Sequence, residues 1–207
     1  MYNNKMIKTF ERPPVDVSTD DDIEMQILTW RTGDFKEHYT INFCGVTKSG
    51  DTIGVTVTDF KPFFYLKTPT NLRWIPAHTR CFSNWCEKTL HENELNTNVK
   101  IDSGLREVLY PFTDGKKFRF LKVTCREHSS MKKIYWKTKY KVNFGILRYC
   151  QFEAYEGNLD PMLRFGHLRE LNMAGWVRIP GGNYKLTDYT KCQINIHVAD
   201  STLLQPY

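Results

Sequence analysis

Several carboxylates in this sequence have the types and spacing of a two-metal nuclease. Asp22-Ile23-Glu24 has the D-x-E form that opens many 3′–5′ exonuclease sites, residues 98–102 loosely resemble a second motif, and residues 184–188 fit a Y-x-x-x-D third motif. Such sites need carboxylates converging on metal ions about 3.5–4 Å apart. Each motif is short, and Glu24 directly follows a polar stretch that makes a poor platform for a rigid site. A small Mg²⁺-dependent 3′–5′ exonuclease is therefore kept as a minor alternative.

A zinc site is the other metal chemistry to weigh. His78, Cys81, Cys86 and His91 are ligand types that zinc accepts. However, the C-x4-C spacing is not that of the usual zinc motifs, and the segment has helical periodicity. Scattered cysteines in such a chain more often act as small buried apolar residues. We therefore predict no metal site and no cofactor in this chain.

The strongest chemical signal is a basic and aromatic window at residues 115–148. It contains eleven Lys or Arg residues against the single acid Glu127, which gives a net charge of +10, whereas the whole chain has 29 basic and 23 acidic residues and a net charge of +6. Lysine and arginine neutralise phosphates, and aromatic rings stack on bases. The window predicts a nucleic-acid-binding surface, and a solvated charged face is the alternative.

Individual residues of this window are candidates for contacts with DNA. The candidate phosphate contacts are Lys116, Lys117, Arg119, Lys122, Lys132, Lys133 and Lys137. The candidate stacking residues are Tyr135 and Trp136, for which core packing is the alternative.

The elements that must position these residues are strands and a few helices. Apolar residues alternate with polar ones in successive segments, which predicts antiparallel strands. Strands are expected near residues 23–30, 39–43, 53–57, 63–66, 118–123, 176–179, 184–186 and 192–198. Residues 102–104 are expected to be a linking stretch. Together, the expected strands and helices predict an α+β fold that is mostly antiparallel sheet with about three helices.

Three segments have the periodicity or the start signals of helices. One is expected at about residues 78–95, and a short basic helix is expected to begin at a cap formed by Ser129 or Ser130 and to end near Lys137. The third has the clearest start, because Asp160 suits the N-cap and Pro161 the first helical position. It is expected to run to about Leu171.

Length and composition bound the class of protein. The chain has 207 residues, 41% of them hydrophobic, which suffices for a real core, and no apolar run approaches a membrane span. Residues 1–22 are expected to form a flexible N-terminal arm and residues 23–207 a folded domain. The start lacks the apolar run of a signal peptide, so we expect an intracellular protein with no membrane partner. A complete multidomain polymerase does not fit in this length.

Six segments, in order and at compatible spacings, resemble family B DNA polymerases of large DNA viruses and eukaryotes. The resemblance is greatest to those of giant viruses, the nucleocytoplasmic large DNA viruses, and covers about residues 23–198. The segments are Glu24–Trp30, Pro62–Lys67, Phe112–Lys122, Tyr155–Phe165, Ala174–Val177 and Lys191–Ile194.

The resemblance implies the N-terminal domain of a replicative DNA polymerase, in the region before the exonuclease domain. In that family the region contains an RRM-like element, packs on the exonuclease domain and borders the single-stranded template. No catalytic residue of the family is carried over, because the true D-x-E motif follows the segment that resembles Lys191–Ile194. Archaeal members read deaminated bases near a P-x-x-Y segment, but viral and eukaryotic-type members are not expected to, so Pro62 and Tyr65 receive no such role.

The resemblance also sets expectations for cofactors, partners and location. Mg²⁺ would serve the parent polymerase and not this chain. The expected partners are single-stranded template, primer-template, the exonuclease and polymerase domains, and a sliding clamp through the parent. The expected location is the host nucleus or a cytoplasmic virus factory. The alternative is a stand-alone single-stranded-DNA-binding subunit of a split polymerase.

Overall fold

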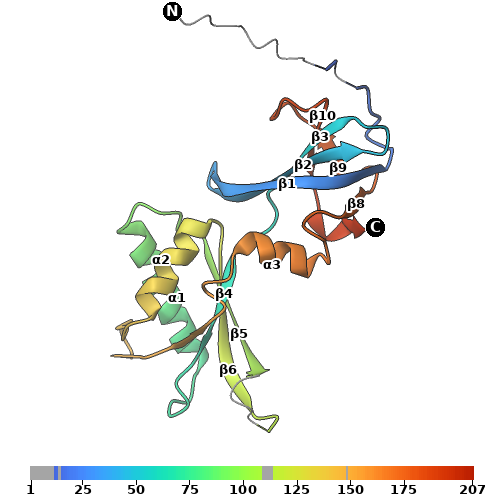
Figure 1. Ribbon diagram of the computed structural model, residues 1–207. Coiled ribbons are helices and arrows are strands. Elements are labelled where there is room, and N and C mark those ends of the chain that lie inside the picture. Colours follow the sequence, from blue (N-terminus) through green and yellow to red (C-terminus); the bar gives the residue numbers. More distant parts are fainter. Residues whose placement is uncertain (1–11, 14, 109–113, 148) are drawn as a thin grey trace, which may run out of the picture. The chain divides into compact units, whose positions relative to one another are not determined.

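The computed structural model describes residues 12–13, 15–108, 114–147 and 149–207. These residues form two compact units. Unit 1 contains residues up to 31, residues 42–57 and residues 169–207, and unit 2 contains residues 32–41 and 58–168 (Figure 1). The sequence predicted a single domain after residue 22.

Unit 1 is built on a seven-stranded sheet. The strand order is β11-β8-β1-β2-β3-β10-β9. The strands are β1 (Ile23–Phe35), β2 (His38–Thr47), β3 (Thr52–Val57), β8 (Trp176–Ile179), β9 (Tyr184–Leu186), β10 (Ile194–Val198) and β11 (Gln205–Pro206), and a short 3-10 helix spans Ser201–Leu203. The tips of β1 and β2, residues 32–41, belong to unit 2.

The register of this sheet follows the alternation of apolar residues. Ile23 pairs with Ile179 in the antiparallel β1–β8 ladder, whereas β10 runs parallel to β3 with Ile194 opposite Ile53. Alternate residues of β1 and β10, such as Met25 and Ile196, are buried, which places one side of each strand in the core.

Unit 2 contains a β-α-β-β-α-β element. In chain order it comprises β4 (Phe63–Lys67), α1 (Pro76–His91), β5 (Val99–Glu107), β6 (Lys117–Cys125), α2 (His128–Thr138) and β7 (Glu153–Tyr155). The four strands form a sheet in the order β5-β6-β4-β7, with antiparallel neighbours. This connectivity and order define the split βαβ arrangement, so the expected RRM-like element is present. Helix α3 (Pro161–Leu168) follows it.

The core of unit 2 lies between one face of this sheet and helices α1 and α2 (Figure 1). Phe64 and Leu66 of β4 and Leu121 and Val123 of β6 are fully buried there. The helices contribute Phe82, Cys86, Leu90, Met131, Ile134 and Tyr135. The opposite face of the sheet is left without a covering from α1 or α2.

The structure confirms the α+β class and the mostly antiparallel sheets, and its three α-helices lie close to their expected positions. Asp160 caps α3 as predicted, because its carboxylate accepts a hydrogen bond from the Met162 amide at 2.8 Å. The helix ends at Leu168, before the expected Leu171. Residues 102–104, expected to be a linking stretch, lie inside β5.

The start of α2 corrects a prediction. The helix begins at His128, and neither Ser129 nor Ser130 caps it. The Asp34 carboxylate accepts hydrogen bonds from the amides of His128 and Ser129 at 2.8 and 2.9 Å. The cap therefore comes from a residue 94 positions earlier in the chain.

The expected flexible arm, residues 1–22, lies partly outside the described residues. Its described end makes specific contacts within unit 1. The Tyr184 hydroxyl donates to the carbonyl oxygens of Ser18 and Asp21 at 2.8 Å. The Arg178 guanidinium donates to the Asp22 carboxylate at 3.0 Å and holds the pKa of that carboxyl below its usual value. Among the described residues, no helix has both the length and the apolar character that crossing a bilayer requires.

Candidate nucleic-acid interface

The uncovered face of the RRM-like sheet carries rings and cations. Side chains alternate between the two faces of a strand, so the residues between those of the helix-covered core point to this other face. We call it the open face. It consists of Phe63, Tyr65 and Lys67 of β4, Lys100, Asp102 and Arg106 of β5, Phe118, Phe120 and Lys122 of β6, and Glu153 and Tyr155 of β7.

Two strands present the same pattern on this face. Residues 63–67 of β4 read F-x-Y-x-K, and residues 118–122 of β6 read F-x-F-x-K. The two strands are antiparallel neighbours, with Tyr65 opposite Lys122 and Lys67 opposite Phe120. Rings and lysines are therefore interleaved in two dimensions.

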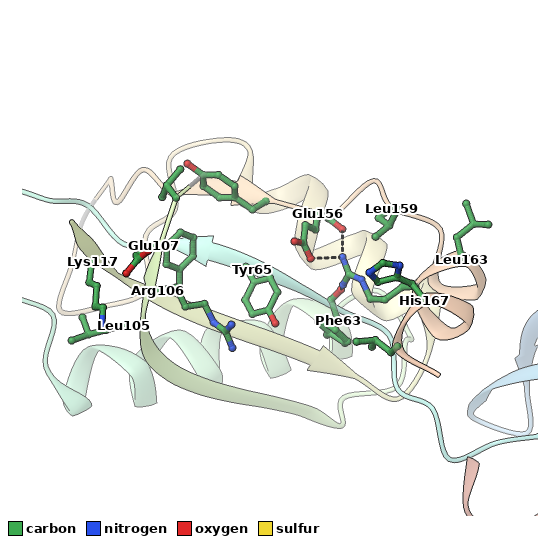
Figure 2. A pocket seen from close by; sticks show the side chains of 15 residues that line it. Phe63, Tyr65, Leu105, Arg106, Glu107, Lys117, Glu156, Leu159, Leu163 and His167 are labelled. Atoms are coloured by element: carbon green, nitrogen blue, oxygen red, sulfur yellow. Dashed lines mark hydrogen bonds and ion pairs between the residues drawn. The ribbon is translucent and has the colours of Figure 1, made fainter. Parts of the chain in front are cut away.

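A hollow of about 1110 Å³ lies over part of the open face and is closed on one side by α3. In Figure 2, Tyr65 and Phe63 stand on the sheet, and His167 lies on the side of α3 that is turned toward them. Arg106 and Lys117 lie at the other end. The hollow is thus lined by aromatic, aliphatic and cationic side chains from β4, β5, β6, β7 and α3, and by two acids, Glu107 and Glu156.

The cations of the open face lie against its rings. Lys122 Nζ is 3.9 Å from the centroid of Phe63, and Lys67 Nζ is 4.4 Å from that of Phe118. The Arg106 guanidinium carbon is 4.7 Å from the Tyr65 centroid. Such cation–π contacts hold the charges over the ring faces.

Burial and pairing tune the charges of this face. Burial lowers the pKa of Lys122, although nearby Asp102 opposes the shift. Glu153 accepts from Lys67 Nζ at 2.8 Å and from the Tyr155 hydroxyl at 2.5 Å, and these bonds lower the pKa of its carboxyl. Burial raises the pKa of Tyr155 to about 12, with Glu153 adding to the effect. The Tyr155 hydroxyl therefore stays protonated at neutral pH.

The open face has a buried support. Arg164 of α3 is 5% exposed and donates to the carbonyl oxygen of Phe63, to the carbonyl oxygen of Glu156 at 3.1 Å and to the Glu156 carboxylate at 2.8 Å. Its guanidinium carbon is 4.2 Å from the Phe63 centroid. Arg164 therefore links α3, the end of β7 and the first ring of the open face.

The structure divides the candidate residues predicted from the sequence into separate groups. Lys117 lines the hollow, Lys122 lies on the open face, and Lys116 lies beside Phe118 with Nζ 5.5 Å from the ring centroid. Arg119 points to the other face, where Nη1 lies 3.4 Å from Ser103 Oγ.

The remaining candidates lie on helix α2. Lys132, Lys133 and Lys137 belong to this helix. Tyr135 is buried against Phe64, with ring centroids 5.6 Å apart, while Trp136 is 56% exposed. Core packing therefore describes Tyr135 and not Trp136.

Sequence reasoning did not single out Tyr65, Lys67, Arg106 or Tyr155 as binding candidates. The predicted buried strand at residues 63–66 is confirmed, because Phe63, Phe64 and Leu66 are buried, while Tyr65 is only half-buried. The repeated ring-x-ring-x-Lys pattern of residues 63–67 and 118–122 was the available signal. The segment resembling Phe112–Lys122 begins at residues 112–113, which lie outside the described residues.

Three acidic residues of the first two exonuclease-like motifs pair with cations. Asp22 pairs with Arg178, Glu24 with Lys48, and Asp102 with Lys100 at 3.1 Å. Within the described ranges, no three His, Cys, Asp or Glu side chains gather as metal ligands do. These contacts add nothing in favour of the exonuclease interpretation.

The fold has a counterpart among solved structures. The family B DNA polymerase from the hyperthermophilic archaeon Pyrobaculum calidifontis matches 84% of this chain and 19% of its own, with a TM-score of 0.59 and 13% identity. This likeness defines the fold class: an α+β module of the kind found within a much larger polymerase.

The sequence comparisons lead to the family. No family model matches the chain. The DNA polymerase of Pyramimonas orientalis virus is 27% identical over 83% of this chain, that of Acanthamoeba polyphaga mimivirus 24% over 90%, and the DNA polymerase delta catalytic subunit of Arabidopsis thaliana 25% over 79%. The chain spans only 12 to 15% of the length of these relatives. The matches confirm the resemblance: the chain is related to the family B DNA polymerases of giant viruses and eukaryotes and is consistent with their N-terminal region.

Proposed function

We propose that this chain is the non-catalytic N-terminal region of a replicative DNA polymerase and that it binds single-stranded template DNA through its open face. In this proposal it also packs on the exonuclease domain of the same protein. Template-directed nucleotidyl transfer, assisted by Mg²⁺, belongs to other domains of that protein.

The open face is the observation that carries the proposal. Four-stranded RRM sheets stack unpaired bases on the aromatic residues of their central strands. Here the two central strands, β6 and β4, present the half-buried rings of Tyr65 and Phe118 on this face, together with the buried rings of Phe63 and Phe120. Lys122 lies over Phe63 and Lys67 over Phe118. Ring stacking tolerates any base, and cations track the phosphates. Sequence-independent binding is what a template-holding surface requires.

Fluorescence anisotropy with a labelled oligothymidine tests the binding. Replacing two half-buried rings, Tyr65→Ala with Phe118→Ala, removes two stacking platforms. At about 1–3 kcal/mol per base, the double variant should bind at least tenfold more weakly. Tyr189→Ala is the matched control, because Tyr189 is 64% exposed and belongs to unit 1. Equal affinities for the control and the double variant would contradict the proposal.

The same experiment separates the alternatives. Mg²⁺-dependent shortening of the oligonucleotide, abolished by Asp22→Ala, would support the exonuclease instead. A stand-alone subunit of a split polymerase would use the same surface. It is distinguished by co-purification with a separately encoded polymerase chain, whereas an in-frame continuation into a D-x-E strand identifies the polymerase N-terminal region.

A further inference from the structure

Helix α2 carries a second group of cations and rings, away from the sheet. Residues four apart lie on one side of a helix. Lys132 and Trp136 form one such pair and Lys133 and Lys137 form another, and Lys139, Tyr140 and Lys141 directly follow the end of the helix at Thr138. The other side of the helix, with Met131, Ile134 and Tyr135, is buried. We call these seven outward residues the α2 stripe.

The lysines of the α2 stripe form no ion pair with any described residue. No acid occurs in the sequence between Glu127 and Glu153. In the part of the chain that the structure describes, none of the five lysines has a carboxylate oxygen within 4.0 Å, although other surface lysines, such as Lys67 and Lys100, do. Like charges this close repel one another. A polyanion placed along the stripe would remove that repulsion.

The rings of the stripe are open to contact. Trp136 is 56% exposed and Tyr140 is 73% exposed. Lys139 Nζ lies 3.8 Å from the Trp136 centroid, so a cation is already held beside the largest ring. Unpaired bases can stack on such rings, whereas the bases of a duplex have no free faces. The combination favours a single strand over a duplex.

The α2 stripe and the open face are different surfaces of unit 2. Helix α2 packs on the side of the sheet that holds Phe64 and Val123, and the open face is the other side. A helix with its side chains is about 10–12 Å across, so the outward stripe is separated from the open face by the whole helix and the sheet. One short oligonucleotide cannot lie flat on both.

We propose that the α2 stripe is a second binding surface for single-stranded nucleic acid, contacting phosphates through Lys132, Lys133 and Lys137 and stacking a base on Trp136. This surface acts independently of the open face. It would engage a segment of strand other than the one held there.

Charge substitution in the full chain tests the proposal. The variant Lys132→Gln/Lys133→Gln/Lys137→Gln removes three charges from the stripe. The control Lys61→Gln/Lys185→Gln/Lys191→Gln removes three exposed charges elsewhere and leaves the same net charge. Binding to a 30-nucleotide oligothymidine is measured against salt. At about 0.7 per phosphate on single strands, the slope of log K against log salt should become shallower by about two in the stripe variant. Relative to a common affinity near 1 M salt, its binding near 0.1 M salt should then be about a hundredfold weaker than that of the wild type.

Equal effects of the two triple variants would overturn the proposal, because only total charge would then matter. Far-ultraviolet circular dichroism should show unchanged helix content, since glutamine is a good helix former. Competition with poly-glutamate tests the assignment to nucleic acid. If poly-glutamate displaces the labelled oligonucleotide from the wild-type chain as effectively as unlabelled oligothymidine, the assignment is overturned.

Cross-linking separates this surface from the open face. An oligonucleotide containing 5-iododeoxyuridine should cross-link to the peptide containing Trp136 and Tyr140. These cross-links should persist in the Tyr65→Ala/Phe118→Ala variant, which is defective in the open face. Cross-links confined to residues of the open face would overturn the second surface and leave the first intact. Cross-links confined to the α2 stripe would contradict the proposed function and support the second surface alone.

Discussion

Replacing Arg164 by methionine should destabilise unit 2 by about 3 kcal/mol. Methionine keeps much of the apolar stem but loses every donor. The wild-type guanidinium donates to two backbone carbonyls, of Phe63 and Glu156, and to the Glu156 carboxylate. The substitution leaves the Phe63 carbonyl without this donor next to a buried ring.

The magnitude follows from the environment of each bond. Hydrogen bonds made by a charged donor contribute about 1.5–3 kcal/mol each, and two of them end on backbone carbonyls. The ion pair with Glu156 adds less than about 1 kcal/mol, because that carboxylate side chain is 53% exposed. Burial of the guanidinium, which lowers its pKa, offsets part of the gain. The sum is about 3 kcal/mol.

Hydrogen exchange is the suitable assay, because a chain of two compact units need not unfold in one step. Protection of amides in β4 and β6 should fall about a hundredfold, at about 1.4 kcal/mol per factor of ten. Amides of β10 in unit 1 should change little. Arg119→Met is the control, since Arg119 is exposed and its side chain makes a long hydrogen bond of 3.4 Å to Ser103 Oγ. A loss below 1 kcal/mol, or one no larger than in the control, would refute the reasoning.

Four further predictions concern stability and reactivity. Asp34→Ala should cost about 1–2 kcal/mol in urea unfolding of unit 2, because α2 loses its cap, and an unchanged midpoint would contradict this. Phe82→Ala, in the core at 0% exposure, should cost about 3–5 kcal/mol by the same assay, and a cost near that of a surface substitution would count against it. Burial lowers the pKa of His128 in the folded chain. The free energy of unfolding should therefore be constant above the unfolded pKa of about 6.5 and should decrease as the pH falls below it. In the His128→Asn variant this decrease should be smaller. Buried Cys86, whose pKa burial raises, should resist a thiol reagent in the native chain, whereas the half-exposed Cys192 should react; equal rates would contradict the burial.

The helix starts show what local sequence can and cannot predict. Asp160 and Pro161 are adjacent in the chain, so their roles at the start of α3 follow from short-range preferences. The cap of α2 does not, because Asp34 reaches it only after the β1–β2 hairpin has folded. Strand β5 was missed for a related reason. Most of its residues are exposed, so no apolar alternation marks it, and its nine-residue pairing with β6 holds it in place.

The candidate binding residues show the same limit. The basic window is continuous in the sequence, but β6 and α2 lie in different layers, so its cations fall into two groups. Tyr135 and Trp136 are neighbours in the chain and differ completely in exposure, because successive helical residues are rotated by about 100°. Composition predicted the chemistry of the window, whereas the division of its residues between surfaces required the fold.

The register of β4 and β6 explains why the open face is a mixed one. Tyr65 lies opposite Lys122 and Lys67 opposite Phe120, so no lysine of one strand faces a lysine of the other. A slip by one residue would turn Phe64 and Leu66 out of the core. A shift of the register by two residues, in the direction that brings Lys67 opposite Lys122, would place two positive charges next to each other, which is destabilising. Apolar burial therefore excludes the first alternative, and charge repulsion disfavours the second. The pairing that survives places the lysine of each strand opposite a ring of the other strand, so the two lysines of this face do not meet.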